Sequence, residues 1–137
     1  MNPEQEFWYS IRDKAPGFTQ RIETSTGNGV PDVYGCSMGI SYWLELKVWT
    51  PTVGILLRKE QWAWARNLLR HKFQRVFVLA QLQDPKLVML LPVKIILVEA
   101  YGEGSKYVKV ITPDLHLFTS EKKNLKETLI KNIFTIK

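Results

Sequence analysis

Apolar and polar positions recur along this chain with two different periods, which separate helical segments from extended ones. Apolar residues spaced three and four apart indicate helices, whereas alternating or short continuous apolar runs indicate strands. The predicted helices are Pro3–Lys14, Arg58–Lys72 and Asn124–Phe134. The predicted strands are Thr19–Thr24, Val33–Met38, Ser41–Trp49, Arg75–Leu82, Lys86–Leu91 and Lys106–Ile111. This mixture of helices and strands predicts an α/β fold with a central sheet flanked by helices.

Local cap and turn residues agree with these boundaries. Asn2 suits the N-cap and Pro3 the first position of the first helix. Gly39 lies between two predicted strands and favours a hairpin, which would lay Val33–Met38 beside Ser41–Trp49. With 137 residues, 45% of them hydrophobic, and no repeat or long linker, the chain is expected to form one domain over residues 1–137.

The strand at Ser41–Trp49 combines acidic and basic residues on one face. Side chains two apart on a strand project from the same face, so Glu45 and Lys47 point together while Leu46 points into a core. The predicted hairpin brings Asp32 towards Glu45. Two carboxylates and an ammonium would then share a small patch, which suits a magnesium ion, a water and a phosphate.

Mg²⁺ prefers oxygen ligands, usually one or two carboxylates together with substrate phosphate. Asp32 and Glu45 are the candidate carboxylate ligands, and the backbone carbonyl of Leu46 is a further one. Lys47 is a candidate for orienting or deprotonating the attacking water. The alternative is an ordinary ion pair on a solvated strand. The tryptophans that share this face, Trp43 and Trp49, argue against that alternative.

Two polar residues fall on the inward faces of the predicted helices. Glu4 lies within the apolar stripe of the first helix, whereas Glu6 lies on the opposite side. A carboxylate on a buried face is costly unless it is paired or bound to a metal, so Glu4 is a candidate metal ligand; fraying of the helix start is the alternative. Gln61 lies in the stripe of the second helix, where it would support the site or cap nearby backbone.

The overall charge favours a polyanionic partner. Lys and Arg number 19 against 13 acidic residues, which gives a net charge of +6 and a pI near 9.5. Candidate phosphate contacts are Arg21, Ser25, Asn28, Arg58 and Lys59. Each of these is also compatible with ordinary surface polarity.

Several other classes of protein are disfavoured. Cys36 is the only cysteine, so no disulfide framework or cysteine zinc site is expected. The start of the chain lacks the pattern of a signal peptide. The longest apolar stretch, Leu87–Val98, is broken by Pro92 and Lys94 and is too short to span a bilayer. We therefore expect no membrane association and a cytoplasmic protein, in the host cytoplasm if it is phage-encoded.

Taken together, these residues resemble the PD-(D/E)xK, or restriction-endonuclease-like, nuclease superfamily. The similarity is to small phage VRR-NUC-type nucleases and archaeal-type Holliday-junction resolvases, and it runs from about Glu4 to Leu82. The matching residues are Glu4, Arg21-Ile22-Glu23, Gly29-Val30-Pro31-Asp32, Trp43-Leu44-Glu45-Leu46-Lys47 and Gln61. The resemblance implies an αβββαβ core with a mixed sheet, which residues 83–137 would complete with strands and an amphipathic helix.

The resemblance also implies a Mg²⁺-dependent endonuclease acting on DNA, in which Mn²⁺ can substitute for Mg²⁺. Structure-selective cutting of branched DNA, as by a Holliday-junction resolvase in DNA recombination and repair, is the favoured activity, with a homodimer as a plausible assembly. One alternative is a nicking or repair nuclease of the VRR-NUC type. Another is a catalytically silent DNA-binding module, against which the complete set Asp32, Glu45 and Lys47 argues.

Overall fold

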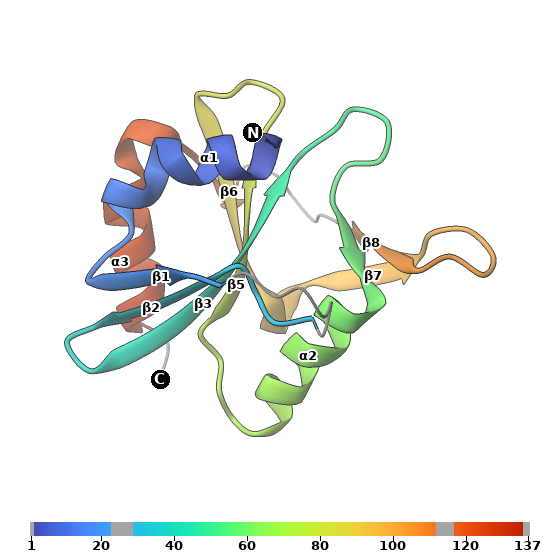
Figure 1. Ribbon diagram of the computed structural model, residues 1–137, viewed down its shortest axis with the longest axis horizontal. Helices are drawn as coiled ribbons and strands as arrows, with labels where there is room; N and C mark the ends of the chain where they lie inside the picture. Colours follow the sequence, from blue (N-terminus) through green and yellow to red (C-terminus); the bar gives the residue numbers. More distant parts are fainter. Residues whose placement is uncertain (1, 23–28, 112–116, 136–137) are drawn as a thin grey trace.

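The computed structural model describes residues 2–22, 29–111 and 117–135 (Figure 1). Its helices are α1 (Pro3–Ile11), α2 (Lys59–Arg70) and α3 (Leu125–Thr135), with short 3-10 turns at Arg12–Lys14, Val93–Ile95 and Lys122–Asn124. Its strands are β1 (Phe18–Arg21), β2 (Val33–Ser37), β3 (Ile40–Val48), β4 (Leu56–Arg58), β5 (Val76–Gln81), β6 (Leu87–Pro92), β7 (Leu97–Ala100), β8 (Tyr107–Ile111) and β9 (Thr119–Glu121).

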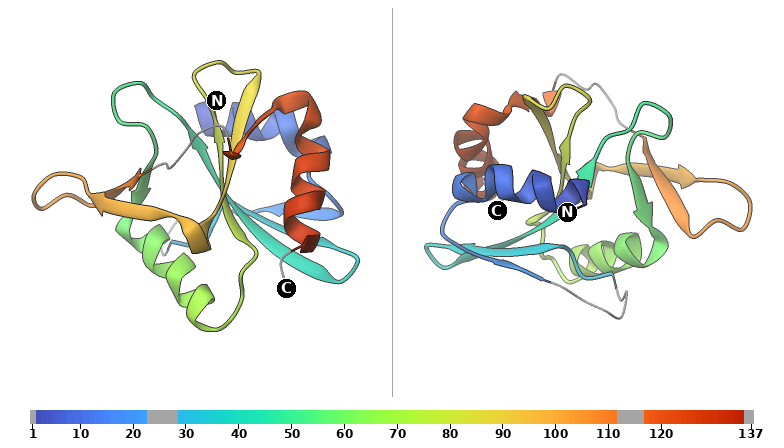
Figure 2. Two further views of the ribbon diagram at one scale, coloured as in Figure 1. Left: turned by 180° about the vertical axis from the view of Figure 1, so that it is seen from behind. Right: turned by 45° about the horizontal axis from the view of Figure 1, so that its top comes forward.

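The main sheet has the strand order β1-β2-β3-β5-β6-β9 and is mixed, as the sequence predicts. Strands β3 and β5 run parallel, while the other neighbouring pairs are antiparallel. Helix α2 connects β4 to β5 and packs on one face of the sheet, whereas α1 and α3 cover the other face (Figure 2). The α/β class with helices on both sides of a mixed sheet is therefore confirmed.

Strand β3 separates two hydrophobic cores. Its side chains Leu44 and Leu46 are fully buried with α1 and α3. Trp43 and Trp49, on the opposite face, pack against the core that includes residues of α2. The alternation of side chains along the strand predicts this division correctly. It also directs Glu45 and Lys47, which lie between the two tryptophans in the sequence, towards α2.

The hairpin between β2 and β3 also forms where the sequence predicts it. Met38 and Gly39 have φ angles of 53° and 79°, the left-handed conformation that two-residue hairpins require. Tyr42 passes directly across Gly35 on the neighbouring strand, where no side chain larger than hydrogen would fit. The Tyr42 hydroxyl donates a hydrogen bond to the Pro16 carbonyl at 2.7 Å, which ties β3 to the chain after α1.

The start of α1 follows the sequence, but the predicted ends of two helices were wrong. Helix α1 ends at Ile11, with a 3-10 turn over Arg12–Lys14, and α2 ends at Arg70, two residues before the predicted Lys72. The Asn2 side chain accepts a hydrogen bond from the Gln5 backbone N–H at 2.8 Å and caps α1. In α3, Leu125, Leu129 and Ile133 are fully buried in the core shared with α1. The apolar stripe of α3 therefore packs on its own domain. Ile130, which the pattern places in the same stripe, is 38% exposed.

Three short strands were not predicted, namely β4, β7 and β9. Each has only three or four residues, which is too short for a periodicity to be recognised. Strands β4, β8 and β7 form a second, smaller sheet. The predicted start of the second helix was wrong by one residue, because Arg58 ends β4 and α2 begins at Lys59. Part of the predicted strand Thr19–Thr24 lies outside the described residues, and β1 covers Phe18–Arg21.

Among the described residues, no helix is long and apolar enough to cross a membrane.

Candidate active site

Strands β2 and β3 separate at the point where the candidate site begins. Their backbone pairing ends at Val33 and Leu44. Beyond this point, the Asp32 side chain supplies the hydrogen bond that a paired β2 backbone would otherwise make to β3. Its Oδ2 accepts a hydrogen bond from the Leu46 backbone N–H at 2.8 Å. In a β-strand, the N–H and the C=O of any one residue point to the same side of the strand. The Leu46 carbonyl therefore also lies on the Asp32 side of β3.

Gln61 connects the charged residues of β3 to helix α2. Its Nε2 donates to both carboxylate oxygens of Glu45, at 2.8 and 3.2 Å. Its Oε1 accepts from Lys47 Nζ at 3.2 Å and from the Arg58 backbone N–H at 2.9 Å. The amide therefore combines the two alternatives that the sequence left open: it caps backbone at the helix start and it contacts the site.

The Glu45 carboxyl group is buried, which disfavours its negative charge. The side chain is only 5% exposed. Burial raises the pKa of Glu45 well above its ordinary value, the neighbouring Asp32 carboxylate raises it further, and Lys47 lowers it. Positive charge such as that of a divalent cation would favour the ionised form of a carboxylate buried beside a second one.

Glu4 faces this group from the first turn of α1. Burial raises the pKa of the Glu4 carboxyl; Lys47, Arg21 and Arg58 oppose the rise, while Asp32 adds to it. Glu6 lies on the exposed side of the same helix. The helical phase thus places Glu4 within the electrostatic reach of the site and Glu6 away from it, as the sequence predicts.

The donors present fit a hard divalent cation. Asp32 and Glu45 supply carboxylate oxygens, and the Leu46 carbonyl lies on the same edge of β3. Within the described ranges, no group of three or more His, Cys, Asp and Glu side chains is close enough to hold a metal ion together. Glu4 is accordingly an electrostatic neighbour of the pair in this structure, and Asp32 and Glu45 are the stronger candidates for ligands.

The candidate phosphate contacts are divided between several elements. Arg21 ends β1, and its Nη1 is buried without a hydrogen-bond partner among the described residues. Arg58 is half-buried at the end of β4, and Lys59 is exposed at the start of α2. Ser25 and Asn28 lie outside the described residues. Arg21 and Arg58 both act electrostatically on Glu4, so these two arginines lie around the carboxylates.

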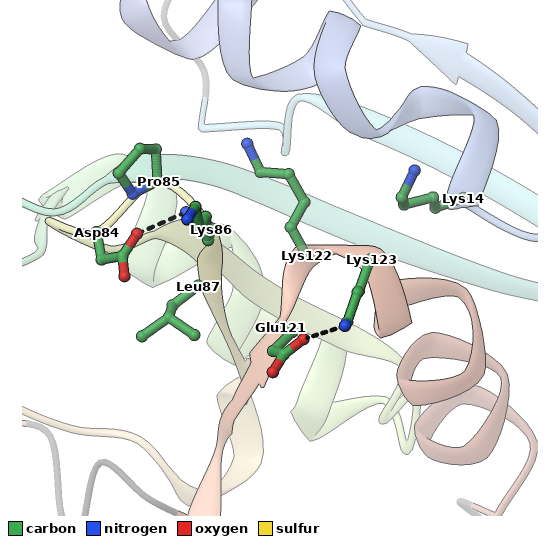
Figure 3. Close-up of a pocket in the computed structure, with 8 residues that line it drawn as sticks. All are labelled: Lys14, Asp84, Pro85, Lys86, Leu87, Glu121, Lys122 and Lys123. Atoms are coloured by element: carbon green, nitrogen blue, oxygen red, sulfur yellow. Dashed lines mark hydrogen bonds and ion pairs between the residues drawn. The ribbon is translucent and has the colours of Figure 1, made fainter.

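A pocket lined by lysines lies elsewhere, and sequence reasoning missed it. Its volume is about 650 Å³, and Figure 3 shows that lysines from three separate parts of the chain line it. These are Lys14, Lys86, Lys122 and Lys123, together with Asp84 and Glu121. Glu121 pairs with Lys123 at 3.1 Å, whereas Lys122 Nζ donates to neutral oxygens, at 2.8 Å to Gln81 Oε1 and at 3.2 Å to Ser10 Oγ. Only the fold brings these lysines together, so no local pattern could reveal them.

The raised pKa values predict an unusual pH dependence of stability. Because the folded pKa of Glu45 lies above the unfolded value, its stabilising contribution is fully present below the unfolded pKa and is lost as pH rises through the folded pKa. Glu4 acts in the same direction. In EDTA, the Glu45→Gln variant should have a higher urea midpoint than wild type at about pH 8, with the difference narrowing towards about pH 5.

The exposed Glu6→Gln substitution is the matched control for this experiment, and it should follow wild type at every pH. A wild-type midpoint that rises steadily over the same range, with Glu45→Gln below it, would contradict the assignment of Glu45 as a buried, destabilising carboxylate.

Comparison with protein-family models and with curated protein sequences finds no match. The arrangement of elements around the carboxylates is that of the restriction-endonuclease-like fold. Among solved structures, the chain is similar to Hjc from Archaeoglobus fulgidus, a Holliday junction resolvase from an archaeal hyperthermophile. The TM-score is 0.57 at 14% sequence identity, and the match covers 91% of this chain and 98% of Hjc. The resemblance to the superfamily is thus confirmed at the level of the fold.

Proposed function

We propose that this protein is a metal-dependent DNA endonuclease that prefers branched DNA, such as a four-way junction. The observation that carries the proposal is the cluster of Asp32, Glu45, Lys47 and Gln61. Gln61 hydrogen-bonds to Glu45 and Lys47, and the Asp32 carboxylate raises the pKa of Glu45. This cluster lies on a fold that the chain shares with a Holliday junction resolvase.

Each residue of the cluster has a separate task in this proposal. Asp32, Glu45 and the Leu46 carbonyl would hold Mg²⁺ or Mn²⁺, which when bound offsets the negative charge of the scissile phosphate. Lys47 directs its ammonium into the site and orients the attacking water. Gln61 fixes the positions of Glu45 and Lys47 relative to each other. Glu4 adds negative charge beside the pair and tightens the hold on the cation.

Binding to DNA would rest mainly on phosphate contacts. The net charge of +6 favours a polyanion, and Arg21, Arg58 and Lys59 surround or adjoin the carboxylates. The lysine cavity of Figure 3 adds further positive charge beside the chain that follows α1. Affinity should therefore fall steeply as salt is added, and it should depend little on base sequence.

The decisive experiment incubates the protein with supercoiled plasmid, linear duplex and a synthetic four-way junction, in Mg²⁺, Mn²⁺ or EDTA. We expect cleavage with either metal, none in EDTA, and faster cleavage of the junction. Cleavage of all three DNAs at one rate would favour a nicking or repair nuclease instead. Binding without cleavage under every condition would make the protein a silent DNA-binding module and would reject the proposal.

The position of Glu4 supports a test that compares two acids on one helix. Glu4→Gln should slow cleavage by about tenfold, or ~1.4 kcal/mol of barrier, because it removes negative charge that favours the cation. Glu6→Gln, on the exposed side of α1, should leave the rate unchanged. Initial rates at saturating DNA and a fixed, subsaturating Mg²⁺ concentration give the comparison. A larger loss for Glu6→Gln would show that α1 does not direct Glu4 to the site.

A further inference from the structure

The outer face of the smaller sheet carries several large exposed side chains. The inner face, with Leu57, Val108 and Val110, is buried in the core shared with α2. The alternation of side chains along the strands places a different set on the outer face. That set comprises Leu56 and Arg58 on β4, Tyr107, Lys109 and Ile111 on β8, and Leu97 and Glu99 on β7.

A row of one cation and two aromatic rings crosses this outer face. Arg58 lies directly opposite Tyr107 in the pairing of β4 with β8. The Tyr101 N–H donates to the Tyr107 carbonyl at 3.4 Å, which continues the pairing of β8 with the end of β7. Residues opposite each other in antiparallel strands share a face. Tyr107 is 41% exposed and Tyr101 is 38% exposed, so both rings are accessible.

The row begins at the candidate active site. The Arg58 backbone N–H is bonded to Gln61, the residue that contacts Glu45 and Lys47, and the Arg58 charge acts on Glu4. The Lys59 N–H donates to the Lys106 carbonyl at 2.9 Å, which fixes the β7–β8 hairpin to the start of α2. Figure 1 shows this hairpin projecting outward from the body of the protein beyond α2. A DNA strand that leaves the site at Arg58 and crosses β8 towards β7 would therefore meet Tyr107 and then Tyr101.

We propose that the row Arg58, Tyr107 and Tyr101 binds unpaired nucleotides of the DNA substrate, with bases stacked on the two tyrosines and a phosphate held by Arg58. The proposal rests on the proposed function and adds to it the feature of the DNA that is recognised, namely unpaired bases beside the cleaved strand. Stacking on an aromatic side chain tolerates any base, but it requires a base whose face is not already covered in a duplex.

Charge distinguishes this occupant from a second copy of the chain. Arg58 begins the row, and Lys59, Lys106 and Lys109 adjoin it, while Glu99 lies opposite Lys109 on the same face. The cations outnumber this acid, which favours a polyanion over a like-charged protein surface. A second copy would instead be expected to use the apolar end of the same face, at Leu97 and Ile111, which are 66% and 41% exposed.

The test measures binding in EDTA, so that it does not depend on cleavage. Fluorescence anisotropy compares a forked DNA with single-stranded arms and a fully paired duplex of the same length. Replacing both tyrosines, as Tyr101→Ala with Tyr107→Ala, should weaken binding to the fork about tenfold and to the duplex less than about twofold. Tyr101→Phe with Tyr107→Phe should bind both DNAs as wild type does, because stacking needs the rings and not the hydroxyls.

Leu97→Ala is the matched control on the same face, and it should change neither affinity nor oligomeric state. Where the double alanine variant fails to fold, the single Tyr101→Ala variant provides the same comparison. A 2-aminopurine at the first unpaired position should lose fluorescence on binding wild type but not the alanine variant. Equal affinity of wild type and the alanine variant for the fork, or an equal loss on both DNAs, would overturn the proposal. So would a dimer that Leu97→Ala or the tyrosine variants convert to monomer, since that would assign the face to a second copy.

Failure of the proposed binding of unpaired nucleotides can be distinguished from failure of the proposed nuclease function. A protein that cuts DNA with Mg²⁺ but binds forks equally well without its tyrosines would remain a nuclease and would lose only this site. A protein that cuts no DNA, yet loses fork binding with the tyrosines, would keep the site and lose the activity.

Discussion

Asp32→Asn and Glu45→Gln should each abolish DNA cleavage, with a loss of at least about 1000-fold, or ~4 kcal/mol of barrier. Each substitution removes one of two carboxylates that lie together at the point where β2 and β3 separate. Without both, the site would lose an anionic ligand for the divalent cation on which the proposed reaction depends. Initial rates of plasmid nicking at saturating Mg²⁺ measure the effect.

DNA binding by these two variants should be retained or slightly strengthened, because repulsion between carboxylate and phosphate falls. Anisotropy in EDTA measures this binding, and calorimetry should show much weaker Mn²⁺ binding by Asp32→Asn than by wild type. Glu60→Gln, which changes an exposed acid in the first turn of α2, is the matched control. Full activity of either variant would remove that residue from the site.

Loss of folding is an unconvincing explanation for inactivity of Glu45→Gln. Burial and the Asp32 carboxylate raise the pKa of Glu45, so its charge is disfavoured in the folded protein. A neutral amide in its place avoids that penalty and should stabilise the metal-free protein at neutral pH. An inactive variant that is at least as stable as wild type would separate the chemistry of the carboxylate from any contribution to the fold.

The centre of the site could be predicted from the sequence because local periodicity determines it. Alternation along β3 buries Leu44 and Leu46 and leaves Glu45 on the opposite face. Helical phase likewise separates Glu4 from Glu6, and the apolar stripe around Gln61 places it inward on α2. These inferences need only the repeat of one helix or one strand.

The rest depends on contacts between distant segments. The hydrogen bond from the Leu46 N–H to Asp32 exists because β2 stops pairing one residue earlier, which no pattern within either strand specifies. The row from Arg58 to Tyr107 requires the register between β4 and β8, strands that are separated in the chain by α2, β5, β6, a 3-10 turn and β7. Strand β4 is only three residues long, so its existence, and therefore its register, had no signal in the sequence.

Lys47→Ala should slow cleavage at saturating DNA by about 100-fold or more, the usual size of the effect when a positioned proton-transfer or water-orienting group is lost. The Lys47 ammonium is held by Gln61 Oε1 at 3.2 Å and lowers the pKa values of both Glu4 and Glu45. Its charge therefore favours the anionic form of these candidate metal ligands, in addition to its proposed action on the water. Lys126→Ala, which removes an exposed lysine from α3, is the matched control for charge and should not change the rate.

The effect of Lys47→Ala has to be interpreted together with that of Gln61, because the Gln61 amide contacts Lys47 through its oxygen and Glu45 through its nitrogen. If Gln61 acts by positioning Lys47, then Gln61→Ala should slow cleavage by about tenfold alone but by much less once Lys47 is already alanine. The non-additivity of the two losses is the expected outcome, measured as rates of the single and double variants at saturating DNA and metal. Losses that multiply fully would show that the amide acts independently of the lysine, through Glu45 or through the substrate. Wild-type rates for Lys47→Ala would exclude the lysine from the chemistry altogether.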